Sequence, residues 1–308
     1  MKIGVVGAGA MGSVYAALLA RGGHEVWALD RWREHIEAIR ANGLRVEGAS
    51  GDHTVPVHAT TEPGEVGPCD LVVIATKAMD VAAAAESAKT LLGPETPVLT
   101  IQNGLGSGEA VCSVLGAGRV VIGVAGGFGG RILAPGHARH EGMELIRLGE
   151  IDGPATARLE RIAEAWRAGG FKVKTFDDIH QLIWEKLICN ASFSPVCALT
   201  GLLVGAVVAN AETFAVSAAL AQESYAVARA KGVRLDIGDP VAYVRDFALK
   251  IPQGRPSMRQ DIEAGRRCEI DAINGGVAQT GREVGVATPV NDACIALVKG
   301  REIALGIR

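Results

Sequence analysis

A helical pattern near residue 185 carries a lysine and an asparagine in apolar surroundings. Lys186 and Asn190 are four residues apart, so they share one face of the expected helix. Most of their neighbours between residues 182 and 190 are apolar. A lysine in that setting either extends its ammonium to solvent or is held as a proton donor for chemistry.

More polar residues follow in the same half of the chain. Ser257 and Asp261 are again four apart, and Glu269 lies just before a further helical segment. A carboxylate near Lys186 can orient its ammonium for catalysis, whereas an exposed pair of this kind is an ordinary salt bridge of little weight. From the residue types alone, both interpretations stay open.

The N-terminus carries a glycine motif in the context that a dinucleotide site requires. The run Gly-Ala-Gly-Ala-Met-Gly directly follows an apolar strand and opens a helix. The first glycine permits a tight turn, the second lets the backbone approach a pyrophosphate, and the third lets the helix pack closely on the strand. The free N–H groups at the helix N-terminus favour phosphate. The residues predicted to bind the cofactor here are Gly7, Gly9, Ala10, Met11 and Gly12.

Asp30 and Arg31, which directly follow the second predicted strand, bear on the choice of cofactor. A carboxylate at the position of Asp30 usually accepts hydrogen bonds from the adenosine ribose and repels a 2′-phosphate. Arg31 comes next and can pair with a 2′-phosphate, or it is simply an exposed arginine. The sequence therefore predicts NAD or NADP, and Asp30 favours NADH slightly.

Two further loops follow the ends of predicted strands, where ligands bind in open α/β sheets. One loop contains Lys77 and the other contains Asn103. We expect both side chains at the ligand edge of the sheet. The alternatives are a solvated lysine at a helix start and a plain Asn-Gly turn.

The first half of the chain alternates short apolar runs with helical patterns, which predicts βαβ units and a parallel sheet. The predicted strands are 2–6, 25–29, 70–75 and 98–101, with edge strands near Val46 and at 54–57. The predicted helices are 10–22, 32–42 and 81–92. Further sheet segments are predicted at 119–124, 136–140, 145–149 and 171–176, with a helix at 155–168.

From residue 178 onward the periodicity is helical. The helical segments are 178–190, 211–231, 240–250, 258–284 and 290–305. The fold class is therefore α/β, with an N-terminal Rossmann-type doubly wound parallel sheet followed by an all-helical C-terminal domain. We predict a dinucleotide-binding domain at 1–177 and a substrate or dimerisation domain at 178–308.

Composition excludes several other classes of protein. The 308 residues suit two domains, and a net charge of −3 with 4% aromatic residues argues against a nucleic-acid partner. No run approaches the roughly 18 apolar residues of a membrane span, and no leader pattern is seen, so we expect a cytoplasmic protein. Six cysteines without CxxC spacing predict reduced, mostly buried thiols and no metal site. An apolar face such as 204–221 suits a homodimer interface or the domain's own core.

Taken together, the motifs resemble those of the ketopantoate reductase (2-dehydropantoate 2-reductase) family over essentially the whole chain. The matching motifs are GAGAMG, ATKAMD, QNGLG, WEKLICN, and PSMRQD followed by EIDAINGG. The resemblance implies a Rossmann domain followed by a helical domain. It also implies an NAD(P)-dependent oxidoreductase that acts on a CH–OH group and reduces the 2-oxo acid ketopantoate to pantoate, a step of pantothenate biosynthesis.

The resemblance implies roles for single residues. Lys186 matches the catalytic lysine, a general acid that protonates the ketone oxygen and stabilises the developing alkoxide. Glu269 matches an acidic residue that orients this lysine and contacts the substrate, and Asn190 matches an asparagine that helps fix the carbonyl. The remaining matches are Ser257 at the substrate carboxylate, and Lys77 and Asn103 where cofactor and substrate meet.

The sequence departs from the family's pattern at three places. Ser194 precedes Pro195 where the family commonly has asparagine, and Val204 stands where a second asparagine is expected. The third departure is Asp30, because this carboxylate favours NADH whereas the family usually prefers NADPH. An apolar residue at 204 favours an apolar substrate group. Two alternatives therefore stay open: an NAD-dependent dehydrogenase of a different 2-hydroxy or 2-oxo acid, and a non-catalytic dinucleotide-binding regulatory protein.

Overall fold

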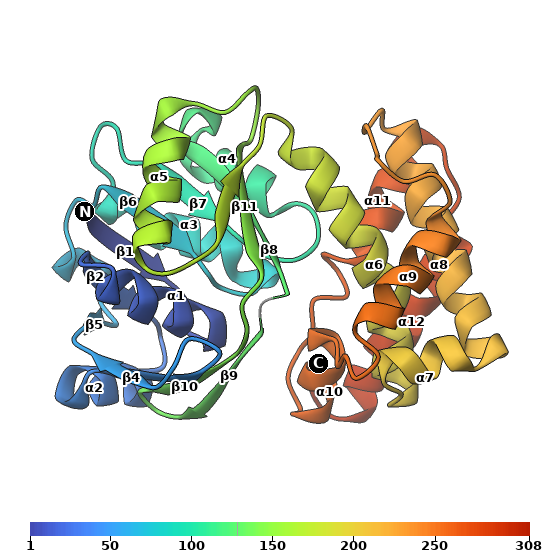
Figure 1. The fold of residues 1–308 in the computed structure, drawn as a ribbon, viewed down its shortest axis with the longest axis horizontal. Coiled ribbons are helices and arrows are strands. Elements are labelled where there is room, and N and C mark those ends of the chain that lie inside the picture. The colour runs from blue at the N-terminus through green and yellow to red at the C-terminus, as the bar shows by residue number, and fades with distance from the viewer. Residues whose placement is uncertain (128) are drawn as a thin grey trace. The chain divides into compact units, whose positions relative to one another are not determined.

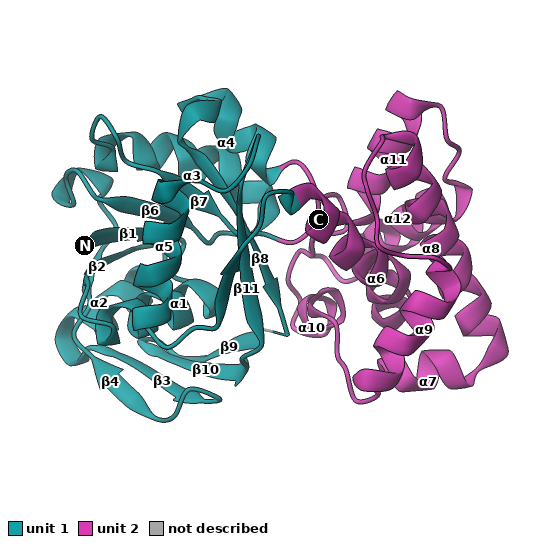
Figure 2. Ribbon diagram, turned by 45° about the horizontal axis from the view of Figure 1, so that its top comes forward, with its two compact units in different colours: residues 1–102, 107–179 teal, residues 103–106, 180–308 magenta. Residues whose placement is uncertain are grey.

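The structure is a computed structural model of the chain, and it describes residues 1–127 and 129–308. It divides into two units, one of residues 1–102 and 107–179 and one of residues 103–106 and 180–308 (Figure 2). The sequence did not indicate that residues 103–106 group with the helical unit. The reason is a long-range contact, because the N–H of Leu105 donates to the carbonyl of Ala272 at 2.9 Å.

The first unit is built on an eight-stranded sheet in the order β12-β11-β8-β7-β6-β1-β2-β5 (Figure 1). Its strands are β1 (Lys2–Val6), β2 (Glu25–Leu29), β5 (His58–Thr60), β6 (Leu71–Ile74), β7 (Val98–Thr100), β8 (Val120–Gly126), β11 (Leu145–Glu150) and β12 (Val173–Thr175). Neighbouring strands are parallel apart from the pair β8 and β11. The chain order reverses at β1, which lies between β6 and β2, and open α/β sheets bind ligands at such a point.

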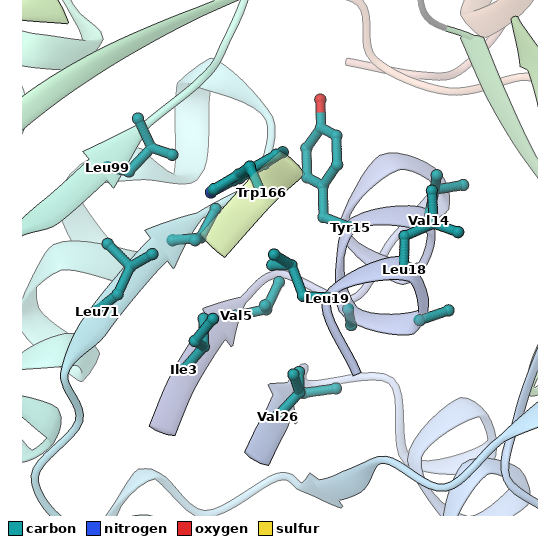
Figure 3. Close-up of a cluster of buried hydrophobic side chains, with 14 of the residues drawn as sticks. Ile3, Val5, Val14, Tyr15, Leu18, Leu19, Val26, Leu71, Leu99 and Trp166 are labelled. Carbon is teal, nitrogen blue, oxygen red and sulfur yellow. The ribbon is translucent and has the colours of Figure 1, made fainter. Parts of the chain in front are cut away.

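Helices cover both faces of this sheet. They are α1 (Ala10–Arg21), α2 (Arg33–Asn42), α3 (Val81–Ala88), α4 (Ser107–Leu115) and α5 (Ala157–Ala168). On one face, Ile3 and Val5 join a core in which Tyr15 of α1 packs on Trp166 of α5, with ring centroids 5.0 Å apart (Figure 3). Gly4, between them, turns to the other face, where an added Cβ would lie 2.6 Å from Leu91. These observations confirm the doubly wound fold.

A smaller sheet of four strands, in the order β4-β3-β10-β9, lies against α1. Its strands are β3 (Leu44–Gly48), β4 (His53–Val55), β9 (Gly129–Ala134) and β10 (His137–Gly142). The prediction of an edge strand near Val46 was therefore wrong, because β3 pairs on both sides, with β4 and β10. The strand β9 and the helix α4 were not predicted. β9 contains two glycines and is largely exposed, so it lacks the apolar alternation that marks a strand.

The second unit is helical. Its helices are α6 (Ile179–Thr200), α7 (Val204–Ala209), α8 (Ala211–Ala230), α9 (Pro240–Lys250), α10 (Ser257–Glu263), α11 (Asn274–Val284) and α12 (Pro289–Ala304). The predicted segment 258–284 is two helices, because α10 ends at Glu263 and the chain turns at Gly265, whose φ of +65° suits glycine. α6 continues through Pro195, well beyond the predicted end at residue 190.

Side chains of α6 belong to two apolar clusters of this unit. Ile188 and Phe193 join one cluster, and Trp184 and Leu187 join another. Positions 186, 190 and 194 recur every four residues and share one helix face. Because apolar packing holds both flanks of α6, the polar side chains on this face start from a rigid support.

The six cysteines are free thiols, and five of them are buried, which confirms that prediction. Burial raises the pKa of Cys69 to about 11 and that of Cys189 to about 12, so both stay protonated near neutral pH. Within residues 1–127 and 129–308, no cluster of His, Cys, Asp and Glu could hold a metal ion. In the same part of the chain, no helix is long and apolar enough to cross a membrane.

Candidate active site

Two glycines of the turn after β1 are required by packing. Gly7 has a φ of +96°, and an added Cβ would lie 2.7 Å from the backbone nitrogen of Thr76. At Gly12 an added Cβ would lie 1.8 Å from the carbonyl oxygen of Gly7. Any side chain at Gly12 would therefore push α1 away from the end of β1.

Gly9 differs, because nothing inside the protein requires a glycine there. Its φ of −65° and ψ of −163° are open to any residue, and an added Cβ would meet no protein atom within 4 Å. α1 then begins at Ala10 without a side-chain cap, so its first N–H groups have no partner within the helix. The open space beside Gly9 and the positive helix end at Ala10 and Met11 fit a pyrophosphate.

Asp30 is held at the carboxyl end of β2 by two backbone N–H groups. Its Oδ2 accepts from Ala8 at 2.7 Å, and its Oδ1 accepts from Trp32 at 3.0 Å. Each carboxylate oxygen can accept a further hydrogen bond. Asp30 is thus fixed beside the glycine turn with capacity for the hydroxyl groups of a ribose.

Arg31 reaches an acidic residue of the neighbouring loop. Its guanidinium lies 3.1 Å from Asp80, and its side chain is 86% exposed, against 39% for Asp80. A pair this exposed contributes little to stability. It nevertheless gives Arg31 a carboxylate partner, Asp80. A 2′-phosphate would have to displace Asp80 in order to pair with Arg31.

The loops after β6 and β7 are joined by Gln102, a residue that the sequence analysis missed. Its Nε2 donates to the carbonyls of Ile74 at 2.7 Å and Thr76 at 3.2 Å. Lys77 comes next and precedes a short 3-10 helix at Ala78–Asp80. Gln102 therefore fixes the loop that carries Lys77. The only signal in the sequence was a polar residue directly before Asn103.

In the second unit, Lys186 and Glu269 are linked through Asn103. The Nζ atom of Lys186 donates to Oδ1 of Asn103 at 2.8 Å, and Nδ2 of Asn103 donates to Oε2 of Glu269 at 3.4 Å. Glu269 is 7% exposed. The neighbouring Gly104 has a φ of +85°, and an added Cβ would lie 2.4 Å from the carbonyl oxygen of Ala272. That close approach explains how residue 103 comes to lie beside α6.

The other predicted substrate residues are less closely grouped. Asn190 lies one turn beyond Lys186 on α6 and is half-buried, and Ser194 follows after another turn and is buried. Ser257 begins α10 and is exposed. In the described part of the chain, no hydrogen bond joins Ser257 to Lys186, Asn103 or Glu269. Val204 is buried in an apolar cluster of the second unit, so the structure gives it a packing role and does not support it as a substrate contact.

A buried carboxylate fixes the segment that carries Glu269. Glu302 is fully buried, and its Oε1 accepts the N–H of Cys268 at 2.8 Å while Oε2 pairs with Arg308. Burial alone would raise the pKa of Glu302, but these partners outweigh burial and lower it. Sequence analysis missed Glu302, because its only local signal was a charged residue in an amphipathic helix.

The start of α11 is also tied to α6. Nδ2 of the buried Asn274 donates to the carbonyl of Ala191 at 3.0 Å and to Oδ1 of Asn291 at 2.9 Å. Glu223 in turn accepts from Nδ2 of Asn291 at 2.7 Å. Glu269 therefore lies between two anchored points, the Cys268 N–H and the first residue of α11.

A mostly parallel sheet with a glycine turn at its reversal point defines the first unit as a Rossmann-type dinucleotide-binding fold. The second unit adds a lysine bonded to an asparagine, which in turn donates to a buried carboxylate. Comparison with known proteins identifies the family. The family model described as "Ketopantoate reductase PanE/ApbA" matches residues 3–153, and the one described as "Ketopantoate reductase PanE/ApbA C terminal" matches residues 178–302.

Individual proteins resemble the chain over its full length. A 2-dehydropantoate 2-reductase of Mesorhizobium japonicum is 35% identical, with 99% of each chain covered. The crystal structure of a PanE/ApbA family ketopantoate reductase from Ralstonia eutropha JMP134 has a TM-score of 0.91 at 35% identity, covering 99% of this chain and 100% of that one. The ternary structure of D-mandelate dehydrogenase with NADH and anilino(oxo)acetate has a TM-score of 0.93 at 27% identity, with 100% of both chains covered.

The chain belongs to the ketopantoate reductase family. It is accordingly an NAD(P)-dependent oxidoreductase that acts on a CH–OH group.

Proposed function

We propose that this protein reduces a 2-oxo acid to the corresponding 2-hydroxy acid, with ketopantoate as the first candidate substrate. The observation that carries the proposal is the hydrogen-bonded group of Lys186, Asn103 and Glu269. An ammonium held by an amide that is itself bonded to a buried carboxylate suits a general acid. An exposed surface ion pair would not need such support.

Each residue of the group has a chemical role in the proposal. Lys186 donates a proton to the ketone oxygen and stabilises the negative charge that develops on it. Asn103 orients the ammonium, and Glu269 offsets its charge. Asn190, one turn further along α6, donates to the same carbonyl. A bound reduced nicotinamide supplies the hydride.

We propose that the cofactor lies along the glycine turn, with NADH preferred. The space beside Gly9 and the uncapped start of α1 suit the pyrophosphate, and Asp30 suits the ribose hydroxyls. The pairing of Arg31 with Asp80 weakens the case for a 2′-phosphate. We also keep Lys77, after β6, as a contact where cofactor and substrate meet, and Ser257 as a contact of the substrate carboxylate.

A second candidate substrate is a 2-hydroxy or 2-oxo acid other than pantoate or ketopantoate. Two observations favour it: the likeness to D-mandelate dehydrogenase over the full length of both chains, and Ser194 where the family commonly has asparagine. Serine is shorter than asparagine, and it offers a hydroxyl in place of an amide on the α6 face that carries Lys186 and Asn190.

The test is an assay of NADH and NADPH oxidation against ketopantoate and a panel of other 2-oxo acids, followed by 2-hydroxy acids in the oxidative direction. Fast turnover of ketopantoate supports the first candidate, and preference for another acid supports the second. Dinucleotide binding with no turnover of any acid would favour a non-catalytic regulatory role. The predictions of a homodimer and a cytoplasmic location are tested by the molar mass in solution and by cell fractionation.

A further inference from the structure

Two tryptophan–histidine stacks lie in the first unit, and one of them stands beside the cofactor carboxylate. The rings of Trp32 and His35 are 4.9 Å apart at 15°, and those of Trp27 and His58 are 4.6 Å apart at 16°. Trp32 is 38% exposed, whereas His35 is fully buried. One face of the Trp32 indole is thus covered by the imidazole, while much of the residue stays open to solvent.

Trp32 is tied to the residue that faces the ribose. The backbone N–H of Trp32 donates to Oδ1 of Asp30. The other oxygen of Asp30, Oδ2, accepts the backbone N–H of Ala8 in the glycine turn. The loop of Asp80, which pairs with Arg31 next to Trp32, also carries Met79, another exposed large apolar residue. Exposed aromatic and apolar side chains next to a ribose site suit the flat faces of a nucleobase.

The buried His35 holds the stack in position. Its Nδ1 accepts the N–H of Gly136 at 3.0 Å, so Nε2 carries the hydrogen and donates to Oγ of Ser13 at 3.1 Å. Ser13 in turn donates to the carbonyl of Ala8 at 2.8 Å. The support of the indole and the support of the glycine turn are therefore one buried network. It joins the turn between β9 and β10 at Gly136, α1 at Ser13 and the first turn of α2 at His35.

We propose that Trp32, seated on His35, is the side chain that binds the adenine ring of the dinucleotide. The inference rests on the proposed function, since it requires that the glycine turn and Asp30 bind a dinucleotide. It adds a residue to the cofactor site and names the part of the cofactor that this residue recognises. It also explains why a large aromatic ring is left exposed next to Asp30 rather than packed in the core.

The test compares Trp32→Leu with Trp27→Leu, which removes the other indole of a stacked pair. Calorimetry measures the Kd of the full-length protein for NADH, for ADP-ribose and for nicotinamide mononucleotide. Trp32→Leu should weaken binding of NADH and ADP-ribose by about 5- to 100-fold, the range of a lost base stack, and leave nicotinamide mononucleotide unaffected. Trp27→Leu should bind all three as the native protein does. Equal affinity of Trp32→Leu and native protein for ADP-ribose would overturn the inference and leave the proposed function intact.

A second measurement avoids any doubt about the folding of Trp32→Leu. In the Trp27→Leu protein, Trp32 is the exposed indole, because Trp166 and Trp184 are buried. ADP-ribose should then protect tryptophan fluorescence from quenching by acrylamide. Saturating ADP-ribose without protection would overturn the inference. A native protein that binds no dinucleotide at all would overturn the proposed function together with the inference.

Discussion

The Nζ atom of Lys186 lies 2.8 Å from Oδ1 of Asn103, although the two residues are 83 positions apart in the chain. Asn103 belongs to a four-residue segment, 103–106, that leaves the first unit and groups with the helical one. Since Asn103 also donates to Glu269, it lies between the ammonium and the carboxylate. The loop after β7 thus supplies the residue that orients the proposed general acid.

Replacing Asn103 by alanine should therefore lower turnover with little effect on dinucleotide affinity. The lost hydrogen bond is made to a charged group, and such bonds are worth about 1.5–3 kcal/mol, which corresponds to a loss of about 10- to 100-fold in kcat. The measurement is kcat at saturating cofactor, with Asn42→Ala, an exposed residue at the end of α2, as the control. An unchanged kcat in Asn103→Ala would rule out the orienting role.

Asp30→Ala should shift cofactor preference toward NADPH. Removing the carboxylate takes away an acceptor for the ribose hydroxyls and a charge that repels a 2′-phosphate. The ratio of kcat/KM for NADPH to that for NADH should rise by about tenfold or more. Asp80→Ala is the companion variant, because it frees Arg31 of its partner and should shift preference in the same direction. If neither variant alters the ratio, neither the carboxylate of Asp30 nor the pairing of Arg31 with Asp80 sets the cofactor preference.

Glu302→Ala should destabilise the second unit strongly. Glu302 is fully buried and accepts the N–H of Cys268, so its loss leaves that buried N–H without an acceptor. Arg308 loses one of its two carboxylate partners and keeps the other, Asp271. Leaving a buried donor without its acceptor costs about 1–3 kcal/mol. Urea unfolding measures the change, with the exposed Glu283→Ala as control. A loss below about 1 kcal/mol would show that Glu302 does not anchor the segment before Glu269.

Asp271 should contribute to stability at neutral pH and lose that contribution in acid. Burial opposes its ionisation, but Lys299, Arg308 and Arg267 outweigh burial and bring its pKa to about 2, below its usual value of 3.8. Because the folded-state pKa is the lower one, the stabilisation is present above the usual pKa and disappears as pH falls toward 2. The side chain is 44% exposed, so screening limits the effect to about 1 kcal/mol.

The measurement for Asp271 is the Tm of Asp271→Asn and native protein as a function of pH. The native protein should have the higher Tm near neutral pH, and the two curves should converge as pH approaches 2. A difference in Tm that stays constant with pH would contradict the assigned titration.

The sequence predicted the Rossmann half well where apolar strands are buried on both faces. β1 and β6 are almost entirely buried runs, so their residues alone define them. β9 was missed because it is exposed and carries no apolar alternation. The helical segment 258–284 was predicted as one element because apolar residues keep their helical spacing across the turn at Gly265, where only backbone geometry breaks the helix.

Site residues were predictable by type but not by their partners. A lysine on an apolar helix face and a carboxylate before a later helix indicated Lys186 and Glu269, yet their link through Asn103 depends on a loop whose place in the fold is set by the Gly104 turn. Gln102 and Glu302 act through long-range hydrogen bonds, Gln102 to the carbonyls of Ile74 and Thr76 and Glu302 to the N–H of Cys268. Such bonds have no periodicity, so a single sequence carries no pattern from which to predict them.

The most direct test of the account is turnover of the best 2-oxo acid by Lys186→Ala, measured beside the Kd of the same variant for NADH. Lys186→Ala should lose at least about 100-fold in kcat, the usual weight of a general acid, and should bind NADH about as tightly as the native protein does. Near-normal turnover in Lys186→Ala would contradict the assignment of Lys186 as proton donor and, with it, the proposed mechanism.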